Sequence, residues 1–439
     1  MRDLMLGGII LYLMLQALRH PWIGVLGWCW ISTMNPHTYS WRLSTMPVAA
    51  AMAGATLLGI LFTKDKRSFF IARESGVLML FMLWMCITLP FSISIDDSFD
   101  LWSRVMKIDF MVLVALVLVY TRRQIMAMAW VVTGSLAVFG VKGGLFTIAT
   151  GGSYRVWGPE NTYIEGNNEI ALALVIVIPL LRFLQMTLEN KWAKRGMTAA
   201  MLLCAAAAVG SQSRGALLAL GAMFAMFWWR GKNKVAVGVG LLVLGVAIFV
   251  FMPESWTSRM STIKTYDQDA SALGRINAWW MAFHLAKDHF FGGGFMIYTA
   301  KIFAQYAPDP TDVHAAHSIY FMVLGEQGFI GLFLFLLLWF FTWRSAGRLI
   351  REGRRQVQTK WLSDLGAMSQ ASLMGYFVGG AFLSLSYYDL PYNLMALVVL
   401  GCRYLDRKGW TEEEQQQQAS ESAKAAEAEK RRRIGGLQA

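Results

Sequence analysis

The sequence predicts an all-α polytopic membrane protein. Of its 439 residues, 56% are hydrophobic and only 15% are charged, whereas a soluble domain carries roughly 25% charged residues. Many apolar runs approach the ~20 residues that cross a bilayer, and 18 Trp and 14 Tyr suit aromatic belts at the two membrane interfaces. The net charge of +12 therefore indicates basic loops that orient a membrane protein, and we expect no nucleic-acid partner.

Thirteen apolar runs are candidates for transmembrane helices, and the number could be twelve because the first two are short and separated only by Arg19-His20-Pro21. The runs lie at about 4–18, 22–34, 46–62, 75–93, 109–120, 125–147, 168–184, 197–210, 215–229, 235–252, 318–343, 365–385 and 393–405. We predict N-terminal transmembrane helices at 1–252, a large loop at 253–317, C-terminal transmembrane helices at 318–405 and a polar tail at 406–439.

Lys and Arg predict the orientation because basic loops stay in the cytoplasm. They cluster near residues 64–67, 122–123, 191–195, 230–234 and 344–360, in alternate connections between the runs. The tail then lies in the cytoplasm, and its low complexity predicts frayed helix or disorder. The less basic connections, which lie on the outer side, are about 94–108, 148–167, 253–317 and 386–392.

The connection at 253–317 is long enough to need secondary structure or a function. Within it, residues 273–291 are predicted to form an amphipathic helix on the outer face of the membrane. Its apolar face is predicted from the helical spacing of four side chains, namely Trp279, Phe283, Ala286 and Phe290. An ordinary surface helix is the alternative.

Four basic residues occur on the predicted outer side, where the orientation rule predicts few. They are Arg214, Arg275, Arg155 and Lys142. A cation near hydrocarbon is usually paired or lines a polar cavity, and arginine can grip phosphate with its planar fork. Together they predict a site for a lipid phosphate or pyrophosphate. The alternative for each is a side chain that extends alone to the lipid headgroups.

Two histidines, His314 and His317, stand where the polar loop meets the apolar run at 318–343. A histidine at this border is beside water and partly desolvated, which suits proton transfer. Its alternative is an interfacial residue with no role. Glu326 is a possible supporting residue within the run. Asp389, between the last two runs, could orient the histidine or bind a sugar hydroxyl.

The sequence gives little support for a metal. Asp267-Gln268-Asp269 matches the DxD pattern that many glycosyltransferases use for a metal ion, but such a triplet in a polar loop mostly arises by chance. The four cysteines show no CxxC pairing, and HExxH, P-loop and GxGxxG motifs are lacking. We therefore expect no metal and no cofactor.

One segment resembles the signature of the O-antigen ligase and polymerase superfamily. It is His317-Ser318-Ile319-Tyr320 followed by Leu324-Gly325-Glu326-Gln327-Gly328-Phe329-Ile330-Gly331-Leu332. Ser213-Arg214-Gly215 and Gly274-Arg275 resemble the other two landmarks of that family. The opening Met1-Arg2-Asp3-Leu4, with Arg19-His20-Pro21 and Met34-Asn35-Pro36-His37, also resembles a branch described as O-glycosylation ligases.

The resemblance implies a GT-C-like membrane glycosyltransferase that acts without a metal in lipopolysaccharide biosynthesis. The donor would be a glycan on undecaprenyl pyrophosphate, and the acceptor a sugar of lipid A-core. The enzyme would lie among the lipids of the bacterial inner membrane, with a periplasmic active site. Carried over, His317 is the catalytic base and Arg214 and Arg275 bind the donor pyrophosphate. A neutral histidine can take the acceptor proton, arginines can neutralise the leaving group, and direct displacement would invert the anomeric carbon.

Two related activities remain open, because both share the donor chemistry. They are O-antigen polymerase and protein O-oligosaccharyltransferase, and the large loop with its Trp-rich helix favours the ligase. A transporter of lipid-linked sugars is less favoured, since no internal repeat of broken helices is visible and the charges cluster at one interface.

Overall fold

The computed structural model describes residues 2–65, 71–231, 234–261 and 270–415, together with residues 418 and 422. Within these ranges every regular element is an α-helix or a short 3-10 helix, and no strand occurs. The prediction of an all-α fold is therefore confirmed.

Each predicted apolar run falls on an α-helix. The first seven are α1 (Arg2–Arg19), α2 (Pro21–Met34), α3 (Val48–Phe62), α4 (Arg73–Thr88), α5 (Ile95–Leu118), α6 (Arg122–Ala149) and α7 (Asn167–Thr187). The others are α8 (Lys191–Gly210), α9 (Arg214–Arg230), α10 (Lys234–Phe251), α14 (Ile319–Gly353), α15 (Lys360–Gly380) and α16 (Asp389–Asp406). The connections contain α11 (Glu254–Ser261), α12 (Ala270–Asp288), α13 (Ala300–Tyr306) and the 3-10 helices η1 (Pro36–Tyr39), η2 (Leu43–Thr45) and η3 (Leu89–Phe91).

The first two runs form separate helices. His20 leaves the helical conformation, with φ −128° and ψ 83°, and Pro21 occupies the first turn of α2. Proline is tolerated there because that N–H has no partner within the helix. α1 and α2 then pack against each other.

Four helical segments of the described ranges are long and apolar enough to cross a membrane. They are Arg73–Phe91, Arg122–Ala149, Asn167–Thr187 and Ile319–Gly353. These segments fit a membrane protein. Twelve or thirteen spans stay a prediction, because helices such as α2, with 14 residues, and α3, with 15, fall short of the ~20 residues that span a bilayer.

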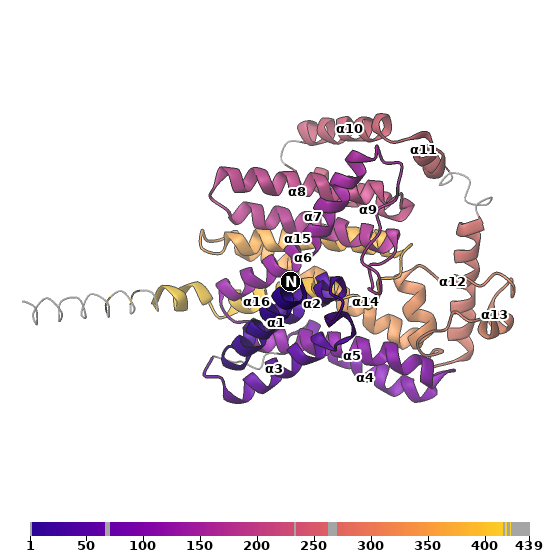
Figure 1. Ribbon diagram of the computed structural model, residues 1–439, viewed down its shortest axis with the longest axis horizontal. Helices are drawn as coiled ribbons and strands as arrows, with labels where there is room; N and C mark the ends of the chain where they lie inside the picture. The colour runs from indigo at the N-terminus through magenta and orange to yellow at the C-terminus, as the bar shows by residue number, and fades with distance from the viewer. Residues whose placement is uncertain are drawn as a thin grey trace, which may run out of the picture.

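α7 is the central helix of the bundle. Every residue from Ile170 to Leu181 is buried, as expected for a helix that is apolar on all sides. It contacts α6, α8, α9 and α15, and Figure 1 shows it lying alongside α8 and α15. The polar start of α7, Asn167 to Glu169, is therefore held in place by a packed core.

α12 corresponds to the predicted amphipathic helix, and its predicted apolar face was right only in part. The helix begins and ends three residues earlier than predicted. Ala286 of the predicted face is buried, and Trp279 packs against the buried cluster. The rest of the buried side is built on Ala278, Met281, Ala282 and Leu285. Small residues let α12 lie close to α14, whereas the large aromatic side chains fill the borders of that contact. Figure 1 shows α12 standing across one end of the bundle.

The connections predicted to be outside converge near α12. Ile93 N donates to Gly293 O at 2.9 Å, and Ser98 Oγ donates to Phe295 O at 2.8 Å. The rings of Tyr163 and Tyr388 lie 6.2 Å apart. The rings of Phe295 and Tyr387 lie 5.3 Å apart, so the four connections join in one assembly. The side of a membrane on which it lies stays a prediction.

The start of the predicted tail is ordered. Residues 409–415 are helical, Tyr404 Oη donates to Glu413 Oε2 at 2.9 Å, and Arg407 pairs with Glu412 at 2.7 Å. Ion pairs and hydrogen bonds therefore hold residues 409–415 to the bundle, and the expectation of frayed helix or disorder for the low-complexity stretches stays a prediction. Beyond residue 415, only residues 418 and 422 are described.

Candidate active site

α12 holds the loop that carries the two histidines. The Asn277 amide donates to the carbonyls of Asp309 (2.8 Å) and Asp312 (3.0 Å) and accepts from the Asp309 N–H (2.9 Å). Trp279 Nε1 donates to Ala316 O at 2.7 Å. These bonds fix an irregular loop that would otherwise leave backbone groups unpaired.

His317 lies at the end of this loop, directly before α14. Its φ is +43°, in the left-handed region, which costs about 1–3 kcal/mol for a residue with a side chain and tends to occur at functional sites. Its side chain is 33% exposed. The strained backbone places a partly desolvated imidazole at the start of the helix.

A carboxylate lies beside His317. Nδ1 of His317 is buried and 3.8 Å from Glu169 Oε1, at the start of α7. Such distances are common in substrate-free sites and shorten when substrate binds. Once within hydrogen-bond distance, a carboxylate that accepts from Nδ1 would favour the tautomer that leaves Nε2 free to accept a proton. Glu169 was not singled out in the sequence, where an acidic residue opening an apolar run reads as an ordinary helix start.

Arg275 completes this cluster. Its positive charge acts on both Glu169 and His317. Burial, followed by the charges of Arg275 and His314, lowers the pKa of His317 to about 4. The imidazole is therefore neutral at pH 7, the form that can accept a proton. The structure thus brings two predicted site residues together and adds a third.

His314 is more exposed and has its own partner. Its side chain is 47% exposed, and its Nδ1 lies 2.6 Å from Asp312 Oδ1. Its ring packs on Gly274, where a Cβ would lie 2.7 Å from Nδ1. Glycine at 274 therefore permits the contact between the helix of Arg275 and the histidine loop.

Arg214 occupies the first turn of α9, at a sharp corner. Ser213 caps the helix by accepting from Ala216 N at 3.2 Å, and Gln212 has a φ of +58°. The Asn167 amide donates to Ser211 O at 2.8 Å, which joins this corner to the start of α7. A helix N-terminus and an arginine together favour an anion.

A link through aromatic residues runs from this corner to α12. Gly215 packs on Phe382, and the ring of Phe382 lies 6.4 Å from that of Trp279. Trp279 is one turn after Arg275 on α12. The corner of Arg214 and the cluster around His317 therefore share neighbours at one end of the bundle.

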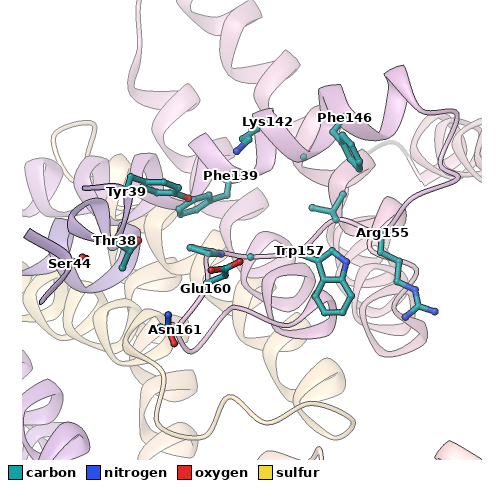
Figure 2. A pocket seen from close by; sticks show the side chains of 14 residues that line it. Thr38, Tyr39, Ser44, Phe139, Lys142, Phe146, Arg155, Trp157, Glu160 and Asn161 are labelled. Carbon is teal, nitrogen blue, oxygen red and sulfur yellow. The ribbon is translucent and has the colours of Figure 1, made fainter. Parts of the chain in front are cut away.

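The structure brings Lys142 and Arg155 together on a separate pocket, drawn in Figure 2. Lys142 lies on α6 and Arg155 on the connection that follows it. Arg155 Nε donates to Gln212 Oε1 at 3.4 Å, so this pocket adjoins the corner of Arg214. The predicted donor-binding residues thus fall into two neighbouring groups.

Glu326 organises a break in α14. Gly328 departs from the helix with φ +68° and ψ −174°, and Gly293 N and Gly294 N donate to the carbonyls of Gly325 (2.8 Å) and Glu326 (3.0 Å). The buried Glu326 carboxylate accepts from Tyr387 Oη at 2.8 Å. These contacts make Glu326 part of the scaffold of the signature segment, and a supporting role in the site stays a prediction.

Asp389 is buried at the start of α16. Its carboxylate interacts with Ser32 and Cys29 of α2. A role in orienting the histidine stays a prediction, and the carboxylate measured beside His317 is that of Glu169. The DxD triplet at 267–269 lies outside the described residues.

Comparison with known families divides the chain into two parts. Residues 1–189 match a family of unknown function, DUF5935. Residues 199–336 match the family described as O-antigen ligase. No curated protein matches the chain. The second match contains Arg214, Arg275, His314 and His317, whereas Lys142, Arg155 and Glu169 lie within the first.

Proposed function

We propose, because residues 199–336 match the family described as O-antigen ligase, that the protein is a glycosyltransferase acting on lipid-linked glycans. It takes a glycan from undecaprenyl pyrophosphate and joins it to a sugar hydroxyl of lipid A-core. The observation that carries this proposal is the cluster of His317, Glu169 and Arg275. It combines a neutral base before α14, a neighbouring carboxylate at the start of α7 and a cation on α12.

In the proposed reaction His317 Nε2 takes the proton of the acceptor hydroxyl. The acceptor oxygen forms a bond to the anomeric carbon while the bond from that carbon to the pyrophosphate oxygen breaks. The leaving pyrophosphate keeps the bonding electrons, and Arg214 and Arg275 neutralise the charge that develops on it. Attack opposite to the leaving group inverts the anomeric configuration.

Donor binding would also strengthen the base. In the free protein the charge of Arg275 helps to lower the pKa of His317. A pyrophosphate bound to Arg275 would offset that charge, and the pKa would rise toward the working pH, where a general base is most effective. His317 would therefore become a better base when the donor is in place.

We place this site on the periplasmic side of the bacterial inner membrane. The support is the basic pattern of the connections and the convergence of four less basic connections on one assembly. Labelling of a cysteine at residue 300 in intact cells is the expected result. Labelling only after permeabilisation would reject the orientation.

The decisive test is glycan transfer by purified protein with undecaprenyl-pyrophosphate-linked donor and lipid A-core. Transfer should persist in excess EDTA, because arginines carry the proposed charge stabilisation. Activity that disappears in EDTA and returns with magnesium or manganese would contradict this and favour the DxD triplet.

Deletion in the host identifies the acceptor. Lipopolysaccharide without O-antigen, together with accumulated lipid-linked polymer, supports the ligase. Failure to form polymer would point to the polymerase, and unglycosylated pilin with unaltered lipopolysaccharide would point to a protein O-oligosaccharyltransferase.

A further inference from the structure

The pocket of Figure 2 has a lining unlike that of the cluster around His317. It encloses about 630 Å³, within the roughly 300–1,000 Å³ typical of small-molecule sites. One wall comes from α6, one from the η1–η2 connection and one from the connection after α6. Two regions that are distant in the sequence, residues 38–44 and 139–161, thus build a single concave site.

Aromatic faces are open to this pocket. Trp157 is 60% exposed and Tyr39 41% exposed, and Figure 2 shows Phe139 next to Tyr39. Aromatic side chains that stay uncovered in a concave site are available to a ligand with an apolar face.

Polar groups of both kinds share the same walls. Lys142 can only donate hydrogen bonds, the Glu160 carboxylate can only accept them, and Asn161 can do both. Thr38 and Ser44 add hydroxyls from the facing connection. A ligand that complements this lining has many groups that donate and accept, together with apolar patches.

The backbone around Trp157 is fixed. Gly158 N donates to Glu165 O at 2.9 Å, and Asn161 N donates to Glu165 Oε2 at 2.8 Å. Val156, next to Trp157, packs on Gly143, where a Cβ would lie 2.8 Å from it. The exposed indole therefore extends from a constrained turn, which reduces the ordering that binding requires.

A phosphate alone would not use this lining. Lys142 and Arg155 would attract it, but Glu160 would repel it, and the exposed aromatic faces would stay uncovered. Figure 2 shows the Arg155 guanidinium beyond Trp157 from Glu160. An acyl chain would need a continuous apolar wall, which Glu160, Asn161 and Ser44 interrupt. A sugar ring combines apolar C–H faces with a rim of hydroxyls that donate and accept.

We propose that this pocket is a binding subsite for sugar units of a glycan, with Trp157 and Tyr39 as stacking faces and Lys142, Glu160 and Asn161 as hydroxyl partners. This inference rests on the proposed function and extends it. The same connection continues from Trp157 to Glu169 beside His317, and Arg155 joins the corner of Arg214. A glycan held here would therefore lie beside the corner of Arg214, on the connection that leads to Glu169.

Binding of soluble oligosaccharides to full-length purified protein tests the subsite. The probes are dephosphorylated core oligosaccharide released from host lipopolysaccharide, repeat-unit glycan released from host undecaprenyl pyrophosphate, and inorganic pyrophosphate. Trp157→Ala should weaken binding of one oligosaccharide about tenfold, the typical scale for loss of a central aromatic contact. Trp157→Phe should recover part of it, Glu160→Gln should weaken it less, and pyrophosphate binding should not change.

Trp41→Ala is the matched control. Trp41 is 86% exposed and lies on the same η1–η2 connection, but it does not line the pocket, so its replacement should leave binding unchanged. The oligosaccharide whose binding is weakened by Trp157→Ala identifies the substrate that this pocket holds. Weaker binding of core would indicate an acceptor subsite, and weaker binding of repeat unit would indicate a donor subsite. In transfer assays Trp157→Ala should raise KM for that substrate while kcat changes little.

The subsite would be rejected if neither oligosaccharide bound, if Trp157→Ala and Trp41→Ala behaved alike, or if the pocket variants reduced pyrophosphate binding instead. His317→Ala separates this outcome from the proposed function, since it should abolish transfer and keep oligosaccharide binding. Full transfer by His317→Ala would refute the proposed base while the binding result for the pocket stood by itself.

Discussion

The histidine loop at 309–317 and the pocket connection at 153–166 are both irregular segments pinned by hydrogen bonds, yet they present their side chains differently. The first ends in a partly desolvated imidazole with a strained backbone and a neighbouring carboxylate. The second presents exposed aromatic and polar side chains. Proton transfer needs a desolvated, oriented base, whereas a large ligand needs an open surface. The comparison separates a region for chemistry from a region for recognition.

The largest effect expected on this comparison comes from His317→Ala. Loss of a general base typically lowers the rate by about 10²–10⁴-fold, whereas donor binding should change little. His314→Ala is the matched control, because its ring is more exposed and pairs with Asp312, and it should be mild. Transfer and donor binding are measured at equal expression. If His314→Ala were inactive and His317→Ala active, the base would be His314 and not His317.

Next in size are Arg275→Ala and Arg214→Ala. Each should lose about 1.5–3 kcal/mol of charge-assisted contact, or roughly one to two powers of ten, in donor affinity as well as rate. Arg→Lys should restore little, because lysine lacks the bidentate fork. Lys142→Ala is the comparison from the pocket. If it lost as much donor affinity as the arginine variants, the pocket and the His317 cluster would be parts of one phosphate-binding site.

A smaller effect is expected from Asn277→Ala, which removes three hydrogen bonds to the histidine loop. Buried groups left unpaired cost about 1–3 kcal/mol, so the loop should loosen and kcat should fall about tenfold. Hydrogen exchange of residues 309–316 should become faster. Asn161→Ala, on the pocket, should leave both exchange and kcat unchanged, and a similar loss in both variants would contradict the division.

Local chemistry explains what the sequence predicted well. Hydrophobic runs of helical length became helices because apolar side chains must be buried or face lipid. His317 and Arg275 were predicted through a short signature and lie together in the structure.

Longer-range features escaped sequence reasoning. Glu169 reaches His317 only because the buried core places the start of α7 beside the start of α14, and no local pattern encodes that meeting. The face of α12 was predicted only in part, because large aromatics dominate a periodicity count, whereas close packing selects Ala278 and Ala282. The sequence contained the glycines of the α14 break, but not the hydrogen bonds from Gly293 and Gly294 that stabilise it.

The smallest effect expected is that of pH. His317 acts as a base only when neutral, and burial, Arg275 and His314 lower its pKa to about 4 in the free protein. The kcat/KM of transfer should therefore stay nearly constant from pH 8 to about pH 5 and fall only as pH approaches 4.

In Arg275→Ala one of the charges that disfavour the imidazolium is gone. The pKa of His317 therefore rises, and the acid limb of the pH profile, where kcat/KM falls, moves to higher pH. Because burial is the larger cause and remains, the limb should stop below the ordinary histidine pKa of about 6.5. Arg155→Ala, a change at the pocket, should leave the limb where it is. A wild-type limb near pH 6.5 would show that His317 is not desolvated by its surroundings, and an equal shift in Arg155→Ala would show that its pKa responds to the charge of the whole outer assembly instead of to Arg275.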